Sequence, residues 1–386
     1  MSTPKVSLGD LFHIERGGSP RPIQRFLTNS ENGINWIMIG DTVVGSKYIT
    51  HTKNKIIKEG IKKSREVFPG DFILSNSMSF GRPYILKISG CIHDGWLVLR
   101  PKTKNIDKDF IFHLLSSPIV FRQFKKKAAG ATVKNLNKGL VSSVQVSLPP
   151  LDKQRQIAKI LDGIEELIKT NNNRLRLIDN IIQSKVRNVF YKVPENTWIP
   201  LEKITDKITV GFVGPTSKHE VENGIPLLRN GNIHNGKINL NKLIQVSSDF
   251  HIKNKKSALS PGDVVIARHI SKKINCAVIP ETISNTNCAN LIIIRPGEKL
   301  IPEYIYAIAS SEIGSRTLLK RQVGTAQKVI NTKTFASWKI PVLAMQEQLQ
   351  LGVTIKKQNE LNQIFLNQQK RLEELKNSIS DTYFSL

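Results

Sequence analysis

The feature that most constrains this fold is an internal duplication, which is clearest at the start of two long helical segments. One segment begins at Pro149 and continues to about Tyr191, and the other begins at Pro341 and continues to about Tyr383. Both openings carry proline, leucine and two glutamines at the same places, 192 positions apart in a chain of 386 residues. The chain therefore consists of two copies of one unit, each a globular part followed by a long helix.

Shorter motifs recur in the same order and at similar offsets. Pro69–Asp71 is repeated as Pro261–Asp263, 192 positions later. The loop Gly130–Lys134 is repeated as Gly324–Lys328, 194 positions later. Two copies are too few for a solenoid, so we expect a pseudo-two-fold molecule rather than a repeat array.

The predicted fold class is α+β, with strand-rich globular parts that also contain short helices. The first part is expected to open with a strand over Val6–Phe12, to have further strands at Ile34–Ile39 and Cys91–Leu99, and to form a helix over Phe110–Leu115. The predicted boundaries are 1–151 for the first globular domain, 152–192 for the central helix, 193–343 for the second globular domain and 344–386 for the C-terminal helix.

Both long segments carry heptad patterns, which are typical of coiled coils. The predicted seam of the first contains Leu161, Ile164, Ile168, Asn171, Leu175, Ile178, Ile182, Lys185 and Val189. The predicted seam of the second contains Leu361, Phe365, Gln368, Leu372, Leu375 and Ile379. A helix of about 39 residues is ~58 Å long, which exceeds a small domain. We therefore expect the two helices to pair antiparallel and to separate the two globular domains.

The charge distribution points to a polyanionic partner. Lysine and arginine number 57 against 31 acidic residues, a net charge of +26. The two globular parts carry +22 of this excess, whereas the C-terminal helix is neutral. A basic surface of this kind is typical of nucleic-acid binding, so we expect the globular parts to bind the nucleic acid.

The sequence lacks the common motifs for catalysis and metal binding. The chain has no phosphate-binding Gly-x-x-x-x-Gly-Lys-Ser/Thr loop and no Asp/Asn-Pro-Pro-aromatic motif of amino-methyltransferases. Its eight histidines lack paired ligand spacing, and its three cysteines predict no disulfide framework. No apolar run approaches the ~20 residues of a membrane helix. We expect a non-catalytic, soluble, cytoplasmic binding protein.

These motifs together resemble the DNA-specificity subunit of type I restriction–modification enzymes. The resemblance covers essentially the whole chain and rests on the two Pro-x-Leu-x-x-Gln-x-Gln helix openings, the run Gly324–Asn331 and the strand Gly224–Arg229. The turn Gly17–Pro20 is similar to the N-terminal signature of this family, with Val213–Thr216 as a looser second copy.

The resemblance implies a division of labour. Each globular repeat would be a target-recognition domain that reads one half of a bipartite, asymmetric site in double-stranded DNA, and the coiled coil would set the unread spacer. Two modification subunits would methylate adenine N6 with S-adenosylmethionine, and restriction subunits would use ATP and magnesium. No cofactor or metal is implied for this chain.

Candidate DNA-contacting residues lie in loops that follow corresponding strands. In the first domain they are Ser75, Asn76, Ser77, Arg82, Lys125, Lys126, Lys127, Thr132 and Lys134. In the second they are Arg229, Asn230, Arg268, His269, Lys272, Lys273, Arg321, Gln327 and Lys328. Arginine or lysine can bind guanine and asparagine or glutamine can bind adenine, whereas phosphate contact needs only a nearby positive charge.

Two other functions fit the same sequence features. One is a specificity subunit of a type IIB system, in which nuclease and methyltransferase are fused in a single partner. The other is a non-catalytic RNA-binding or scaffold protein, which would bind random and selected duplexes equally at a fixed salt concentration.

Overall fold

The computed structural model describes residues 5–43, 45–76, 80–129, 135–234, 236–268, 274–319 and 330–384. The chain forms two compact units, of which the first comprises Met1–Asn171 and Asn367–Leu386 and the second Asn172–Leu366. The division falls within both long helices, so each unit contains a globular part and a section of each helix. The segment boundaries predicted at residues 151, 192 and 343 stay predictions. Among the described residues, no helix has the length and apolar character needed to cross a membrane.

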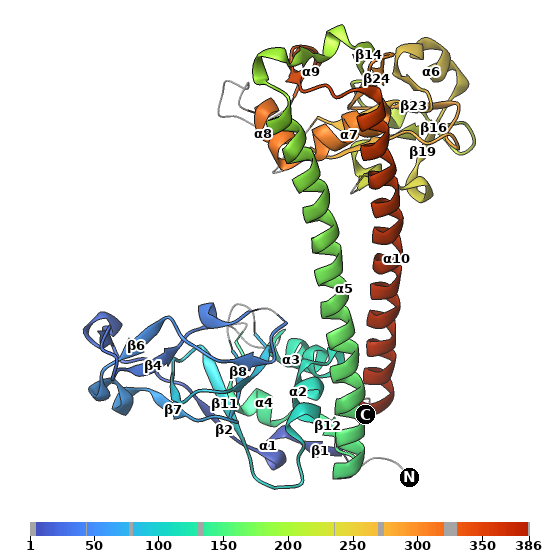
Figure 1. The fold of residues 1–386 in the computed structure, drawn as a ribbon. Helices are drawn as coiled ribbons and strands as arrows, with labels where there is room; N and C mark the ends of the chain where they lie inside the picture. Colours follow the sequence, from blue (N-terminus) through green and yellow to red (C-terminus); the bar gives the residue numbers. More distant parts are fainter. Residues whose placement is uncertain are drawn as a thin grey trace. The chain divides into compact units, whose positions relative to one another are not determined.

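The globular part of the first unit alternates short strands with turns, with one short helix after its first strand and three further helices before its last strand (Figure 1). Its strands are β1 (Lys5–Ser7), β2 (Phe12–Arg16), β3 (Leu27–Thr28), β4 (Ile34–Ile37), β5 (Tyr48–Ile49), β6 (Asn54–Ile56), β7 (Arg65–Val67), β8 (Phe72–Ser75), β9 (Pro83–Leu86), β10 (Gly90–Ile92), β11 (Trp96–Pro101) and β12 (Gln145–Ser147). Its helices are α1 (Leu8–Leu11), α2 (Lys108–Ser116), α3 (Pro118–Ala129) and α4 (Lys138–Ser142).

Alternating side chains along β8 explain the layers of this unit. Phe72 and Leu74 join a core with α2, α3, α4 and the start of the first long helix. Ile73 points the other way and packs with Ile37 and Ile92. Because successive strand side chains face opposite sides, the sheet β2-β11-β8-β9-β5 has helices on one face and the sheet β3-β6-β4-β10-β7 on the other. Both faces are buried, which explains why the strand has no polar alternation.

The second unit repeats this architecture. Its strands are β13 (Ile199–Pro200), β14 (Thr205–Val210), β15 (Glu220–Val221), β16 (Ile225–Leu228), β17 (Ile233–His234), β18 (Lys237–Ile238), β19 (Ile244–Val246), β20 (Ala258–Leu259), β21 (Val264–Ala267), β22 (Cys276–Val278), β23 (Thr286–Cys288), β24 (Leu291–Pro296) and β25 (Lys339–Ile340). Its helices are α6 (Ser248–Lys253), α7 (Pro302–Ser310), α8 (Glu312–Leu319) and α9 (Thr332–Ala336). Val264 and Ile266 pack with the helices, whereas Val265 packs on the opposite face of the sheet β14-β24-β21-β22.

The repeated Pro-Gly-Asp turn has the same function in both units. The Asp71 carboxylate accepts a hydrogen bond from the Arg100 guanidinium at 2.9 Å, and it also accepts one from the backbone N–H of Phe68 at 3.0 Å. The Asp263 carboxylate accepts the corresponding bond from Arg295 at 2.8 Å. The repeated arginine before a proline is therefore the partner of the repeated aspartate, and the pair ties the turn to the neighbouring strand.

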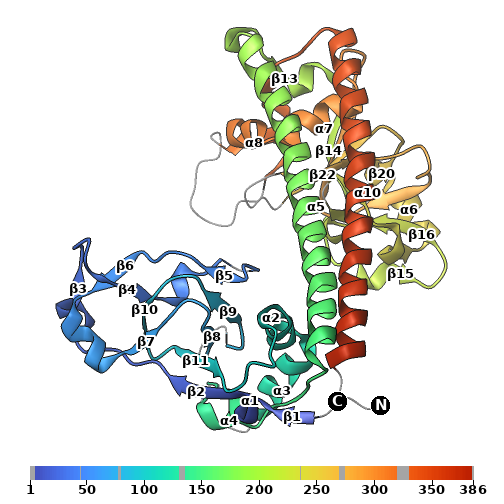
Figure 2. The same cartoon turned by 60° about the horizontal axis from the view of Figure 1, so that its bottom comes forward.

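The two long helices are α5 (Leu151–Lys192) and α10 (Met345–Phe384), drawn in Figures 1 and 2 in green and red. In the first unit, Lys153 contacts the ring of Tyr383 and Glu165 pairs with Lys376. In the second unit, the Arg174 guanidinium lies 5.4 Å from the Phe365 ring centroid, and Lys192 pairs with Glu347. Within each unit the residue numbers rise along α5 as they fall along α10, so the predicted antiparallel pairing is confirmed.

The predicted seam of α5 is correct except near its end. Leu161, Asn171 and Val189 are buried as expected. Lys185 is exposed, and the neighbouring Val186 is fully buried in its place. A lysine keeps its charge in water when an adjacent valine can fill the apolar contact.

One half of the predicted α10 seam is wrong. Phe365, Leu372 and Ile379 are partly buried as expected, but Leu361 and Leu375 are 44% and 49% exposed and Gln368 is also exposed. The covered positions are the next residues along the helix, Asn362, Gln369 and Lys376. With 3.6 residues per turn, two adjacent positions border a seam equally well. The prediction chose the leucines, whereas packing and the Lys376–Glu165 pair turned the polar neighbours inward.

The helix openings are equivalent at an offset of 194 rather than the predicted 192. The Gln154 side chain donates to the carbonyls of Pro149 and Asn105 and accepts from the backbone N–H of Asp107. Gln348 donates to the carbonyls of Leu343 and Lys299 and accepts from the N–H of Ile301. The first glutamine of one motif thus has the role of the second glutamine in the other. The match of both glutamines at 192 was a coincidence of their two-residue spacing.

Two strand predictions were too long. Val6–Phe12 is not one strand, because Ser7 caps the short helix α1 by accepting from the N–H of Asp10 at 3.1 Å. Cys91–Leu99 is divided between β10 and β11, which belong to different sheets. The Gly95 N–H donates to His93 Nδ1, two residues earlier, at 2.9 Å, so the chain turns there.

Candidate nucleic-acid interface

The predicted loops of the first domain begin and end at one edge of its central sheet. Asn76 follows β8, and its carbonyl oxygen accepts a hydrogen bond from the backbone N–H of Leu136 at 2.9 Å. The Asn76 N–H donates to the carbonyl of Gly95 at 3.0 Å. The structure therefore brings Asn76 and Leu136, 60 positions apart in the chain, together at this edge.

The N-terminal glycine turn lies at the same edge. Gly17 donates to the carbonyl of Trp96 at 2.9 Å, and a Cβ on Gly17 would stand 2.0 Å from the carbonyl oxygen of His93. Only glycine permits that approach. Ser19 donates from its hydroxyl to Asp94 at 2.7 Å, and this hydrogen bond lowers the pKa of the Asp94 carboxyl. The fold therefore explains two residues of this turn: Gly17 by its close approach to the backbone, and Ser19 by its hydrogen bond to Asp94.

The second copy of this turn begins two residues earlier than predicted. Gly211 donates to the carbonyl of Leu291 at 2.8 Å, and Phe212 donates to that of Cys288 at 2.9 Å. These bonds match those of Gly17 and its neighbour in the first unit. The second copy therefore starts at Gly211, not at Val213, because backbone contacts rather than residue identity define the turn.

The described candidates of the first domain differ in exposure. The side chains of Ser75 and Asn76 are buried, and the Asn76 amide donates to the carbonyl of Asp94 at 2.8 Å. These two residues shape the edge. Arg82, Lys125 and Lys126 are exposed and Lys127 is half-buried. These four cations are available to a ligand at the surface.

The second domain has the matching edge. The backbone N–H of Ile330 donates to the carbonyl of Arg268 at 3.0 Å, as Leu136 does to Asn76. The guanidinium of Arg268 is half-buried. Arg229 and Asn230 lie between β16 and β17, where Arg229 approaches Glu220 at 4.0 Å. DNA contact by these residues stays a prediction.

Several candidates lie outside the described residues. They are Ser77, Thr132, Lys134, His269, Lys272, Lys273, Arg321, Gln327 and Lys328.

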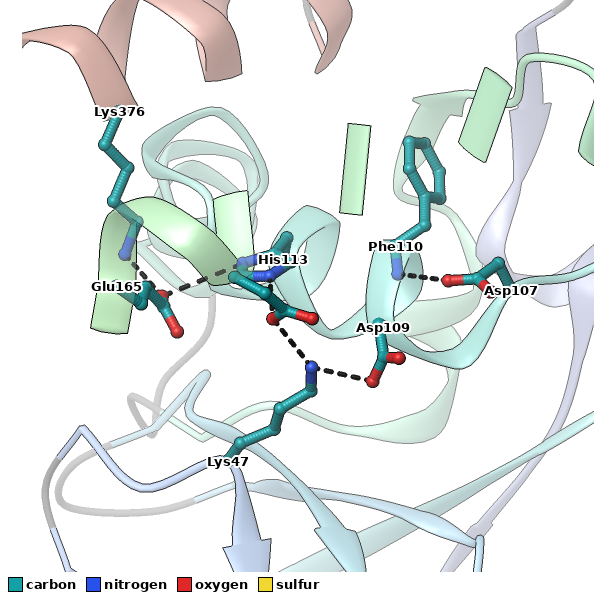
Figure 3. A network of polar contacts seen from close by, with 8 residues as sticks. Lys47, Asp107, Asp109, Phe110, His113, Glu165 and Lys376 are labelled. Carbon is teal, nitrogen blue, oxygen red and sulfur yellow. Dashed lines mark hydrogen bonds and ion pairs between the residues drawn. The ribbon is translucent and has the colours of Figure 1, made fainter. Parts of the chain in front are cut away.

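A charged network joins the first domain to both long helices, and the sequence analysis missed it (Figure 3). His113 of α2 contacts Asp162 of α5 through Nε2 at 2.7 Å, and its Nδ1 lies 3.7 Å from Glu165. Lys47 approaches Asp162 at 2.8 Å, and Lys376 of α10 approaches Glu165 at 2.6 Å. No motif could have revealed it, because its members come from four separate segments.

The same cluster contains three groups of metal-ligand type, His113, Asp162 and Glu165. Their ligand atoms lie within 4.8 Å of one another. Both carboxylates already pair with lysine ammonium groups, Lys47 and Lys376. A divalent cation would have to displace these charges, so we interpret the cluster as an ion-pair network that holds the helices.

Burial and pairing set the charges in this network. Burial lowers the pKa of His113 despite the nearby carboxylates, which keeps the imidazole neutral. Burial would raise the pKa of Asp162, but hydrogen bonds from Lys47 and His113 hold it below its ordinary value. Burial opposes the charge of Lys47, yet its contacts with Asp109 and Asp162 raise the pKa of Lys47. The network is therefore held with paired charges at neutral pH.

Comparison with known proteins agrees with the sequence resemblance. Residues 3–180 match the family model of the type I restriction modification DNA specificity domain. The chain is 24% identical over 358 residues to the type I restriction enzyme MjaVIII specificity subunit of Methanocaldococcus jannaschii, covering 87% of this chain and 81% of the relative. It is 22% identical over 379 residues to the EcoBI specificity subunit of Escherichia coli, covering 89% and 76%.

Solved structures share the fold. The type I restriction–modification S subunit of M. genitalium superposes with a TM-score of 0.59 at 11% identity, with complete coverage of both chains. A chain from a type I restriction–modification complex gives a TM-score of 0.59 at 17% identity, covering 99% and 98%. The matched domain, the relatives and the shared fold together make this chain similar to the DNA-specificity subunits of type I restriction–modification enzymes.

Proposed function

We propose that each unit of this chain reads one half of a bipartite, asymmetric site in double-stranded DNA. The observation that supports this most is that the two units share one structural framework but expose different residues at their surfaces. Both units have the aspartate–arginine turn, the buried glutamine at the helix start and the backbone bond that closes the sheet edge. Their exposed candidate residues differ, as two readers of different half-sites require.

The coiled coil sets the spacing between the half-sites in this proposal. The helix α5 has 42 residues, which corresponds to ~63 Å. Half-sites one helical turn of DNA apart lie ~34–36 Å from each other. A helix pair of this length is longer than that separation, so its remaining residues can pack against each domain.

Catalysis belongs to partner subunits in this proposal. Two modification subunits methylate adenine N6 with S-adenosylmethionine, and restriction subunits with ATP and magnesium cleave unmodified DNA. The type I specificity subunits to which this chain is similar support these partners. The chain itself contributes recognition, and its basic globular parts make binding steeply dependent on salt.

Selection from a random duplex pool tests the proposal. The full chain, with its modification subunits, should enrich a motif of two defined half-sites separated by unspecified base pairs at a fixed salt concentration. Enrichment of no motif, or of a single uninterrupted one, contradicts the proposal. Methylation by the isolated chain would contradict the assignment of catalysis to partners.

Inserting whole helical turns tests the spacing role. Matched insertions in α5 and α10 should lengthen the selected spacer while both half-sites stay the same. The same selection reads out the result. An unchanged spacer in a folded variant would show that the coil does not measure distance.

A further inference from the structure

An exposed aromatic side chain of the first unit lies against Gly81, just before β9. Phe121 of α3 is 42% exposed. Its ring stacks on that of Phe80, with centroids 5.8 Å apart and an interplanar angle of 17°. Phe80 packs against the buried core. Phe80 therefore anchors the ring of Phe121, and the ring of Phe121 presents an apolar surface to solvent.

Gly81, which lies just before β9, fixes the position of this pair. Gly81 has a φ of +80°, and a Cβ there would lie 3.3 Å from Phe121 and 3.2 Å from Phe124. Its N–H donates to the carbonyl of Ser75 at 2.7 Å. Because Gly81 is tied to β8 by this bond and lies close against α3, Phe121 has a defined position beside the residue that precedes Arg82.

The surroundings of Phe121 are cationic. Arg82, Arg122 and Lys125 are exposed, and Lys125 follows Phe121 by one turn of α3. Within the described part of the chain, these three cations form no ion pair. An apolar ring surrounded by unpaired positive charge fits a ligand with an anionic backbone and an apolar group between its phosphates. Duplex DNA has this combination, with the thymine methyl as the apolar group of the major groove.

The second unit lacks this feature. The helices α3 and α8 begin at equivalent places, Pro118 and Glu312, so Ser315 corresponds to Phe121. Ser315 is buried, and its hydroxyl accepts a hydrogen bond from the N–H of Ile274 at 3.1 Å. A residue that reads sequence should differ between two readers, whereas a framework residue should not.

We propose that Phe121 is a specificity-determining residue that contacts a thymine methyl group in the half-site read by the first unit. The proposal rests on the proposed function, since it requires that this unit reads DNA. Phe80 is the positioning residue that holds the ring, and Lys125 contacts a flanking phosphate. The contact selects thymine over cytosine and over uracil, because only thymine carries the methyl group.

Selection with variants gives the first test. Phe121→Ala, in the full chain with its modification subunits, should lose preference for one T·A pair in one half-site and leave the other half-site unchanged. Phe121→Leu keeps an apolar side chain and should retain part of the preference. Phe68→Ala removes a ring that is 52% exposed elsewhere in the same unit and should change neither half-site. Identical half-sites for Phe121→Ala and the wild type would overturn the proposal.

Replacing the selected thymine by deoxyuridine, with wild type and Phe121→Ala compared, gives the second test. Wild-type affinity should fall about threefold to tenfold, as expected for one buried methyl group. Phe121→Ala should show no further loss with deoxyuridine. Equal losses in both proteins, or no methyl-sensitive position in either half-site, would overturn the proposal. A wild type that selects no bipartite motif would instead contradict the proposed function, so the two failures are distinguishable.

Salt dependence separates the ring from its neighbours. Phe121→Ala should lower affinity without changing the slope of log affinity against log salt, because it removes no charge. Lys125→Ala should reduce that slope by about one. A changed slope in Phe121→Ala would show that the ring acts through phosphate contacts, contrary to the proposal.

Discussion

The two units differ most where the domain helix meets the long helices. In the first unit, His113 of α2 contacts Asp162 and Glu165 in the charged network. The second unit has Ala307, Lys356 and Asn359 at the equivalent positions, 194 residues later.

The second unit uses the space differently. Lys356 pairs with Glu303 at 2.9 Å, at the place where the first unit has its network. Beside it, a groove of about 1620 Å³ opens between α7, the hairpin β17–β18 and the long helices. Amide side chains such as Asn275, Asn359 and Asn362 line much of it. The comparison shows that the same backbone fold can have either charged or amide side chains where the domain helix meets the long helices. The hydrogen bonds of the framework elsewhere in the unit are the same in both cases.

The largest difference in stability between matched variants of the two units is expected at the framework arginines. Arg295→Ala should destabilise the protein by about 3–5 kcal/mol, because it leaves the fully buried Asp263 carboxylate without its ion-pair partner. Arg100→Ala should cost less, since the Asp71 side chain is 12% exposed and water can reach it. Chemical denaturation of both variants measures the difference. An equal loss of stability in the two variants would mean that burial of the aspartate does not determine the size of that loss.

The helix-start glutamines should behave alike. Gln154→Ala and Gln348→Ala each remove three hydrogen bonds to backbone groups, so each should cost about 1–3 kcal/mol. Gln156→Ala is the matched control, because Gln156 is exposed on the same helix. Thermal unfolding of the three variants checks the offset of 194. A loss of stability in Gln346→Ala instead of Gln348→Ala would support the offset of 192.

The edge arginines should act on separate half-sites. Arg82→Ala should weaken recognition of one half-site and Arg268→Ala that of the other, each by about 1–3 kcal/mol if the guanidinium contacts a base. Duplex selection and competition binding measure the loss for each half-site. Variants that weaken every sequence uniformly would show that these arginines contact phosphate only.

The corrected coil register predicts a smaller contrast. Leu372→Ala lies in the seam and should cost about 1 kcal/mol, whereas Leu375→Ala, at a half-exposed position, should change stability by less than about 0.5 kcal/mol. Both changes remove the same atoms from the same helix. Denaturation curves compare them, and a larger loss at Leu375 would support the register that the sequence had predicted.

Acidification should affect the first unit in particular. The folded-state pKa of His113 lies below its unfolded value of 6.5, so its stability contribution is complete above pH 6.5 and declines as pH falls toward the folded value. Asp162, with a folded pKa below 3.8, adds a further loss only at lower pH. His113→Gln should remove the decline that begins near pH 6.5. Melting temperatures measured from pH 7.5 to 5 give the answer, and an unchanged profile would exclude His113 as its source.

Much of the fold was predictable because it depends on local patterns. The turns around Asp71 and Asp263, the buried strands beside them and the long helices follow from short-range residue preferences. Their repetition made each prediction stronger. The candidate site was predictable only in part: exposed Arg82 and Lys125 follow from charge and position, whereas the roles of Asn76 and Gly17 depend on distant carbonyl groups.

The sequence by itself determined the duplication, the two helices and the basic character of the globular parts, since composition and periodicity are properties of the chain. Tertiary structure alone decided the offset of 194, the seam at Asn362 and Gln369, and the network around His113. The physical reason is that each depends on which backbone or side-chain atoms come within a few ångströms across the fold. Adjacent positions such as Leu361 and Asn362 fit the helical periodicity equally well. Only the surface that each one meets in the fold decides which of them is buried.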